Sequence, residues 1–375
     1  MSLKLSKNFI SNIYYCAWIM MVVHLCVANS NANLYSAPFI SYIAIIMFAL
    51  KILLQRKFSL INLLLLPMML FIGYECLIHT DDMRVLWFFI AILASKDIDF
   101  EKLIKLTFRT MLICCICFFT LFLLGVIDQT VVNSVRGIRQ SLGLGHPNMF
   151  SAYYSILLTL GIYIKFDKLS IVKLFFLMIG SFIVYSFTKS FSGIITCMCV
   201  ILIVIILKYV PLRNINSRLI IIFLLIGMTV FTLAPILFNE KLLVFDKIVT
   251  GRIHQAHFYY KKYGIDLFGN NVNKDLNSPF TDNILDIGYT KMLLNNGLIY
   301  YLIVVCGYIF SLFRSLEFKN KRMIVLMSGF IIYMFTENVA TYVFMNPSMI
   351  YFSKYLFEFT GKRVKYFGKK HEKNS

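Results

Sequence analysis

The chain alternates long apolar runs with short polar connections along almost its whole length. Runs of about 20 residues, long enough to cross about 30 Å of hydrocarbon, recur from residue 10 to residue 335. An apolar run of this length predicts a transmembrane helix. About twelve such spans are predicted, near residues 10–28, 37–54, 60–78, 83–95, 106–127, 148–164, 171–187, 190–207, 219–237, 284–313, 323–344 and 347–360.

Two of these predicted spans are weaker than the rest. The run at 83–95 is short, but without it every later connection would change sides and the charge pattern described next would be lost. The run at 347–360 contains Lys354 and Glu358. It is therefore interpreted either as a span or as an interfacial basic helix attracted to anionic lipid.

Lysine and arginine give the predicted spans an orientation. Most of the 37 basic residues fall in alternate connections and in the basic tail at 361–375. The positive-inside rule places these segments, and both termini, in the cytoplasm. The net charge of +19 is thus a topological signal, and no nucleic-acid partner is expected.

Composition agrees with a membrane class. The chain is 59% hydrophobic with a mean hydropathy of +0.76, well above the level of soluble domains. Its nine cysteines lie in or near apolar runs, where cysteine packs as a small apolar residue. We expect one all-α integral membrane domain over 1–375, multi-pass in the cell membrane and without a metal cofactor.

Three connections face outward in this topology: the loop at 128–147, the turn at 188–192 and the large loop at 238–282. They carry Arg136, Arg139 and Arg252, although outer connections are usually depleted in arginine. Singly, each would be interpreted as a side chain that reaches lipid phosphates. Together they favour a site for a large anion.

The first outer loop leads into a helix through Gly145, His146, Pro147 and Asn148. Proline favours the first helical turn, and an outward helix N-terminus adds a positive dipole end. His146 can donate, accept or carry a proton near neutral pH. The alternative is that these are ordinary helix-start residues and that His146 only hydrogen-bonds the loop.

The large outer loop predicts a helix from Thr250, as its N-cap, to Gly264 at its end. Arg252, Tyr259 and Tyr263 share one face of that helix. Arginine binds phosphate oxygens in a bidentate manner, and aromatic rings suit sugars, so we expect this face and Tyr260 to bind substrate. An amphipathic surface helix is the alternative.

The segment after the large loop holds further polar residues. We expect 283–296 to be the outer, site-lining part of a long helix. It carries Asn283, Asp286, Tyr289, Lys291 and Asn295.

Glu337 lies within the predicted span at 323–344. An ionisable residue inside a membrane is a functional candidate, with structural pairing as the alternative.

The ordered set of motifs resembles the Wzy-type polysaccharide polymerases of the O-antigen polymerase and ligase superfamily. Those motifs are GLGHPNMFSAYY, FTKSFSG, TGRIHQAHFYYKKYGIDLFGN, DNILDIGYTKMLLNNG, Glu337 and Asn346-Pro347. The resemblance implies a GT-C-like membrane glycosyltransferase that polymerises undecaprenyl-pyrophosphate-linked oligosaccharide repeat units at the outer leaflet. The product would be capsular polysaccharide, exopolysaccharide or O-antigen, and the partners would be membrane lipid, a chain-length regulator and a flippase.

The resemblance also implies roles for individual residues. Arg139 and Arg252 would hold the pyrophosphate, and Lys189 would stand in for a cation usual in the serine-containing turn. Where the ligases usually carry a histidine, this chain has Asp282-Asn283, which favours a polymerase over a ligase.

The chemistry of the proposed reaction needs cations and a base. Breaking a glycosyl–pyrophosphate bond builds negative charge, which Arg136, Arg139, Lys189 and Arg252 would stabilise. Candidate bases for the acceptor hydroxyl are Asp282, His146 and Glu337, in falling order. The remaining predicted substrate contacts are Asn148, Tyr259, Tyr260, Tyr263, Asn283 and Tyr289.

Two rival functions remain open from the sequence. A lipid-linked oligosaccharide flippase would bind the same ligand, but it should show two similar halves and short outer loops. An O-antigen ligase-type glycosyltransferase is the other alternative.

Overall fold

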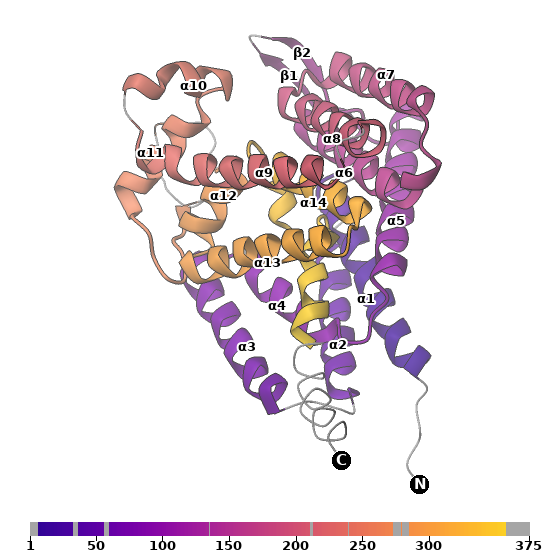
Figure 1. Ribbon diagram of the computed structural model, residues 1–375, viewed down its shortest axis with the longest axis vertical. Coiled ribbons are helices and arrows are strands. Elements are labelled where there is room, and N and C mark those ends of the chain that lie inside the picture. Colours follow the sequence, from indigo (N-terminus) through magenta and orange to yellow (C-terminus); the bar gives the residue numbers. More distant parts are fainter. Residues whose placement is uncertain are drawn as a thin grey trace.

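The structure is a computed structural model that describes residues 7–32, 37–55, 60–134, 136–210, 213–238, 240–272, 279 and 285–357. Helices α1 to α8 are Lys7–Ala28, Ala37–Leu53, Leu60–Thr80, Arg84–Ala94, Phe100–Leu123, Pro147–Lys165, Ile171–Thr188 and Phe191–Tyr209. Helices α9 to α14 are Arg213–Ile236, Leu243–Ile248, Arg252–Tyr263, Gly288–Thr290, Leu298–Glu317 and Lys321–Tyr333. In Figure 1, α1, α3 and α5 run along the long axis of the molecule, whereas α9 and α13 run across it.

The described helices make the chain a predominantly helical membrane protein. Seven of them are long and apolar enough to cross a membrane, and three shorter helices are also apolar. Helix α7 shows how such a helix meets lipid, since Phe175, Phe176, Phe182 and Ile183 are all more than half exposed. The count of about twelve spans, the cytoplasmic termini and the GT-C-like fold stay predictions.

The predicted span at 323–344 is wrong as a single helix. Helix α14 stops at Tyr333, and short 3-10 turns follow at Val339–Thr341 and Pro347–Ile350. Polar side chains support the break, because the amide of Asn338 donates to the carbonyl of Leu285 at 2.7 Å. The span predicted at 347–360 likewise begins with the second 3-10 turn and continues as a helix over 351–357.

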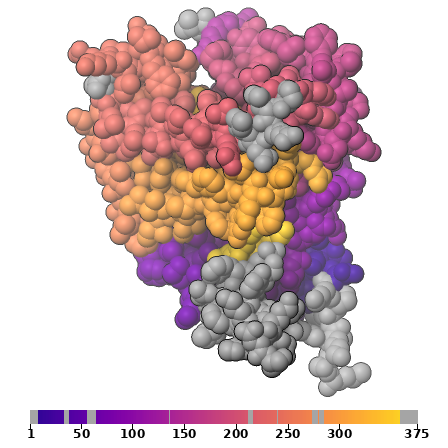
Figure 2. All heavy atoms as spheres, viewed as in Figure 1, coloured from indigo at the N-terminus to yellow at the C-terminus, as the bar shows by residue number. Residues whose placement is uncertain are grey.

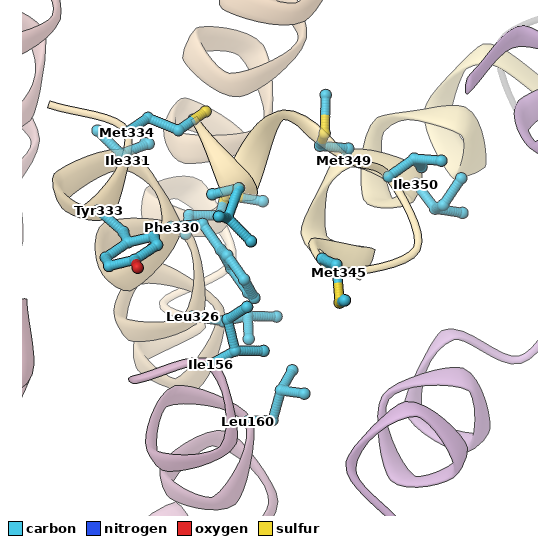
Figure 3. Close-up of a cluster of buried hydrophobic side chains, with 14 of the residues drawn as sticks. Ile156, Leu160, Leu326, Phe330, Ile331, Tyr333, Met334, Met345, Met349 and Ile350 are labelled. Atoms are coloured by element: carbon cyan, nitrogen blue, oxygen red, sulfur yellow. The ribbon is translucent and has the colours of Figure 1, made fainter. Parts of the chain in front are cut away.

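Helix α14 lies at the centre of the fold. Every residue from Met323 to Tyr333 is buried, and the helix packs against α6, α8, α9 and α13. Figure 3 shows Leu326 and Phe330 of α14 with Ile156 of α6 below them and Met345 across from them. The central helix therefore carries the polar residues that follow it, including Glu337, into the interior.

A β-hairpin interrupts the helices in the first outer connection. Strands β1 (Val131–Ser134) and β2 (Gly137–Gln140) pair antiparallel, with Val132 opposite Arg139. Gly137 has φ +98°, a conformation that glycine adopts at little cost in a tight turn. This hairpin, which the sequence analysis did not predict, is what holds Arg139 beside α7 and α8.

Close packing of α6 against α8 depends on Gly193. A Cβ at this position would lie 1.8 Å from the Oγ of Ser151. We expect Gly193→Ala to destabilise the protein by about 1–3 kcal/mol through overpacking. The measurement is the unfolding temperature of the purified protein in detergent.

The double variant Gly193→Ala/Ser151→Ala removes the closest atom and should recover most of the loss, with Ser151→Ala alone as the reference. Equal unfolding temperatures for Gly193→Ala and the unchanged protein would contradict the close approach.

Candidate functional site

A cavity of about 470 Å³ lies between the hairpin, α8, α10 and the segment after α14. Figure 2 shows a notch at the top of the molecule, between the salmon region of α10 and the magenta helices α7 and α8. One part of the cavity wall is polar, and it is formed by Ser134, Arg136, Arg139, Asn148, Ser190, Ser192 and Arg252. All of these residues belong to, or directly follow, connections that the sequence places on the outer face.

Arg252 is held by two carboxylates. Its Nε lies 3.1 Å from Asp286 and its Nη2 lies 3.0 Å from Glu337, while Nη1 donates to the carbonyl of Thr336. Glu337 also accepts a hydrogen bond of 2.5 Å from the hydroxyl of Ser192. Burial alone would lower the pKa of Arg252, but Glu337 and Asp286 outweigh it and raise the pKa. The guanidinium is therefore fixed in place as a cation.

The start of α11 is set by Asp246 and not, as predicted, by Thr250. Thr250 has φ +63° and Gly251 occupies the N-cap position without a side-chain bond. The carboxylate of Asp246 in α10 instead accepts from the backbone N–H groups of Ile253 and His254, at 2.8 and 3.1 Å. A side-chain N-cap usually has extended backbone, and both Thr250 and Gly251 are left-handed, so the cap comes from Asp246 instead. The predicted end at Gly264 is confirmed.

Arg139 is anchored on the other side of the cavity. Its Nε donates to the carbonyl of Thr188 at 2.9 Å, and its Nη2 donates to the side chain of Asn148. Burial lowers the pKa of Arg139, and the positive charge of Arg136 lowers it further. Since a guanidinium stays charged at neutral pH, the crowding of cations favours a bound anion. Five N–H donors per arginine leave some free for that anion.

Helix N-termini add to the positive potential. Helices α6, α8 and α11 each start at the cavity, next to Asn148, Ser192 and Arg252 respectively. The N–H groups of a first helical turn have no partner within the helix, so they attract anions. The predicted helix start at Pro147 is confirmed, and His146 forms its N-cap by accepting from the N–H of Asn148 at 3.1 Å.

The rest of the cavity wall is apolar. It is formed mainly by Phe191, Ile195, Phe231, Phe245, Ile248 and Phe335. Ile248 is 57% exposed, Phe191 41% and Ile195 39%. The apolar wall is thus continuous with the outer surface of α8 and α10, where Leu243 and Val244 are exposed as well. One cavity therefore combines a cationic end with an apolar end that reaches the surface.

The tyrosines of α11 do not line this cavity. Tyr259 is completely buried and stacks on Tyr263 at 6.4 Å. This helix face packs against a small apolar cluster that includes Leu285 and Leu294. The prediction of a sugar-binding surface at Tyr259 is wrong, because amphipathic spacing does not distinguish a face that packs on protein from one that meets ligand. Tyr260 is half-buried beside the same cluster.

Glu337 does not line the cavity either, but it binds Arg252 and Ser192, which do.

Three further predicted residues also lie outside the cavity wall. Tyr289 is completely buried, and its hydroxyl donates to the carbonyl of Ile331 at 3.3 Å. Lys189 ends α7 in a left-handed conformation, with its Nζ 5.9 Å from the ring centre of Tyr185. His146 is used as a helix cap.

Asp282 and Asn283 lie outside the described residues. The long helix expected from 283 onward is interrupted in the part that is described. Helix α12 passes into a π-turn at Lys291–Asn295, and Gly297 separates this turn from α13. Gly297 has φ +95°, and a Cβ there would lie 2.5 Å from the carbonyl oxygen of Leu267. The left-handed backbone of Gly297 ends the helical geometry, and the close approach of the loop leaves no room for a larger side chain there.

Three residues that build the site have no role predicted from the sequence. Ser190 and Ser192 start α8, and Asp286, named only as part of the site-lining segment, completes the pair of carboxylates around Arg252. The motif FTKSFSG contains both serines, but serine is common at the start of any helix. The motif alone therefore does not indicate that these serines line a ligand site. Asp286 could be selected only with knowledge of which arginine it faces.

No protein-family model matches the chain, and no curated protein and no solved structure matches it either. Function is therefore argued from the site.

The ion pair between Glu337 and Arg252 predicts a stability effect. Glu337→Leu leaves a buried guanidinium with one carboxylate fewer, so we expect a loss of about 3 kcal/mol, the lower end for breaking a buried ion pair. The unfolding temperature in detergent measures this loss. Glu337→Gln keeps an acceptor for Ser192 and should lose less. Equal unfolding of Glu337→Leu and the unchanged protein would contradict a structural role for the pair.

Proposed function

We propose that the protein is a membrane glycosyltransferase of the Wzy polymerase type, acting on polyprenyl-pyrophosphate-linked oligosaccharides at the outer face of the cell membrane. The observation that carries the proposal is one cavity whose wall combines Arg136, Arg139 and Arg252 with apolar side chains that are exposed at the surface. An anion joined to a hydrocarbon chain is a ligand that suits both parts of this wall.

The cationic end suits a pyrophosphate. Arg139 and Arg252 are both oriented by protein acceptors, so they present their remaining donors in fixed directions. Arginine binds phosphate oxygens in a bidentate manner, and fixed donors stabilise developing charge without reorganisation. Arg136 is exposed at the rim, where it can meet the anion as it enters.

The apolar end suits the carrier lipid. Phe191 and Ile195 of α8 and Ile248 of α10 all line the cavity, and all three are exposed at the surface. A polyprenyl chain would leave the cavity between these helices into the outer leaflet.

The chemical step follows from the charges. The hydroxyl oxygen of the acceptor unit bonds to the anomeric carbon of the growing chain, and the bond from that carbon to the phosphate oxygen breaks. The electron pair leaves with the lipid pyrophosphate, whose added charge Arg139 and Arg252 stabilise. The hydroxyl proton passes to a carboxylate, for which Asp286 is placed best, since its side chain is 32% exposed next to Arg252. Glu337 is 5% exposed and holds Arg252 in place.

The test is polymerisation by purified protein. Full-length protein in lipid nanodiscs receives lipid-linked repeat units extracted from the source cells, in the presence of EDTA. We expect a ladder of chain lengths on a gel, and a rate about 10²–10³ lower in Arg139→Met, which loses one stabilising donor.

Lys261→Met is the matched control, because it removes one positive charge from an exposed position of α11. It should polymerise normally. A single unextended band from the unchanged protein, despite confirmed binding of the lipid-linked unit, would overturn the polymerase and favour a flippase.

A further inference from the structure

A second polar cluster lies next to the arginine cavity, where the turn between α3 and α4 meets the π-turn. Asp82 pairs with Arg84 at 3.3 Å and accepts from the amide of Asn295 at 3.5 Å. Lys291 is 1% exposed, and Asp82, Arg84 and Asp286 act on its charge. A π-turn is a rare distortion that is found frequently at functional sites.

This cluster contains most of the buried polar atoms that have no hydrogen-bond partner in the described part of the chain. They are Nη1 of Arg84, Oγ1 of Thr290, Oδ1 of Asn295 and both amide atoms of Asn296, with Nε1 of Trp87 one helical turn beyond Arg84. Asn295 and Asn296 are completely buried. Each such atom is costly to leave unpaired, and natural structures rarely concentrate them. A polar ligand would satisfy them together.

The unpaired atoms define the class of that ligand. They include donors on Arg84, Trp87 and Asn296 and acceptors on Asn295 and Asn296. An anion has no donors to offer the acceptors, whereas a sugar hydroxyl donates and accepts at once.

The balance of charges in the cluster also favours a neutral sugar over an anion. Arg84 is already paired with Asp82 and lies 3.9 Å above the ring centre of Tyr342. Lys291 is almost completely buried, and the carboxylates of Asp82 and Asp286 offset its charge. Trp87 lies one helical turn beyond Arg84 and packs against His24 and Phe344.

Asp286 connects the cluster to the arginine cavity. Its carboxylate is 3.1 Å from Arg252, and it also raises the pKa of Lys291 on the side of the cluster. Charges therefore alternate from Arg84 and Asp82 through Lys291 and Asp286 to Arg252. A hydroxyl bound at the cluster would lie on the side of Asp286 away from the cationic cavity.

We propose that the cluster around Asp82, Arg84, Thr290, Asn295 and Asn296 is a saccharide-binding subsite that receives the acceptor sugar, a role that rests on the proposed function. The arginine cavity holds the pyrophosphate of the donor, and Asp286 stands between the two. Thr290 and Asn295 bind acceptor hydroxyls and do not contact the donor pyrophosphate.

The fluorescence of a native tryptophan can report binding at this subsite. The chain contains two tryptophans, Trp18 and Trp87. Trp18 is completely buried and donates to Thr107 at 2.9 Å, away from the cluster. Trp18→Phe leaves Trp87 as the sole indole. The full-length Trp18→Phe protein in nanodiscs is titrated with the lipid-free oligosaccharide released by mild acid from the source's lipid-linked repeat unit.

The expected result is a saturable shift of Trp87 emission. Asn295→Leu and the nearly isosteric Thr290→Val should each weaken it about tenfold, the effect of one lost hydrogen bond of about 1.4 kcal/mol. Unfolding temperatures check that both variants are folded. Arg139→Met, which changes only the other cavity, should leave the shift intact.

Inorganic pyrophosphate, followed by calorimetry, tests the arginine cavity separately. If pyrophosphate binds there and the oligosaccharide leaves Trp87 unchanged, the cluster holds water only and the inference is overturned while the proposed function stands. A Trp87 shift caused by pyrophosphate would overturn it too, because the cluster would then be an anion site. If the unchanged protein does not bind pyrophosphate at all, this result contradicts the proposed function instead.

Discussion

The buried ion pair of Arg252 with Glu337 and Asp286 is the interaction on which the site depends. A guanidinium in this position would be strongly unfavourable without partners, and breaking such a pair costs more than forming it contributes. The three residues come from the start of α11, the break after α14 and the segment before α12. Their pairing joins these segments, and Ser192 extends the network to the start of α8.

The ion pair is formed directly beyond the end of the central helix. Helix α14 is apolar and buried on all sides up to Tyr333, and Glu337 follows one turn later, with its N–H still donating to the carbonyl of Tyr333 at 3.0 Å. Backbone carbonyls beyond the end of α14 have no partner in that helix. Arg252 donates a hydrogen bond to one of them, the carbonyl of Thr336. Asn338 and the 3-10 turns satisfy other groups of the same segment. The polar end of a buried helix thus becomes one wall of an amphipathic cavity.

The cavity and the second polar cluster differ in the chemistry they present. The first offers cations, helix N-termini and an apolar exit, which suit a lipid pyrophosphate. The second offers mixed donors and acceptors with balanced charge, which suit hydroxyl groups. Asp286 pairs with Arg252 at 3.1 Å and acts on the charge of Lys291, so in the proposed reaction it would accept the proton of the acceptor hydroxyl.

Much of the helical framework could be predicted from the apolar runs, because their length and periodicity depend on local sequence. Arg139 and Arg252 could be selected because arginine is unusual in outer connections, and the structure brings both to one cavity.

Other features depend on tertiary contacts that no local pattern records. The close approach of Leu267 to Gly297 is formed between separate segments, and the burial of Tyr259 depends on what α11 packs against. Asp246 caps a helix in which it does not lie.

The central claim is that a lipid pyrophosphate binds with its head at the arginines and its chain between α8 and α10. The most direct test is photocrosslinking of the full-length protein in nanodiscs with a polyprenyl pyrophosphate that carries a diazirine near the pyrophosphate, read by mass spectrometry. The account predicts adducts at Phe191, Ile195 and Ile248 that unlabelled undecaprenyl pyrophosphate displaces and that Arg139→Met reduces. Adducts spread over the lipid-facing side of α7, without displacement, would contradict it.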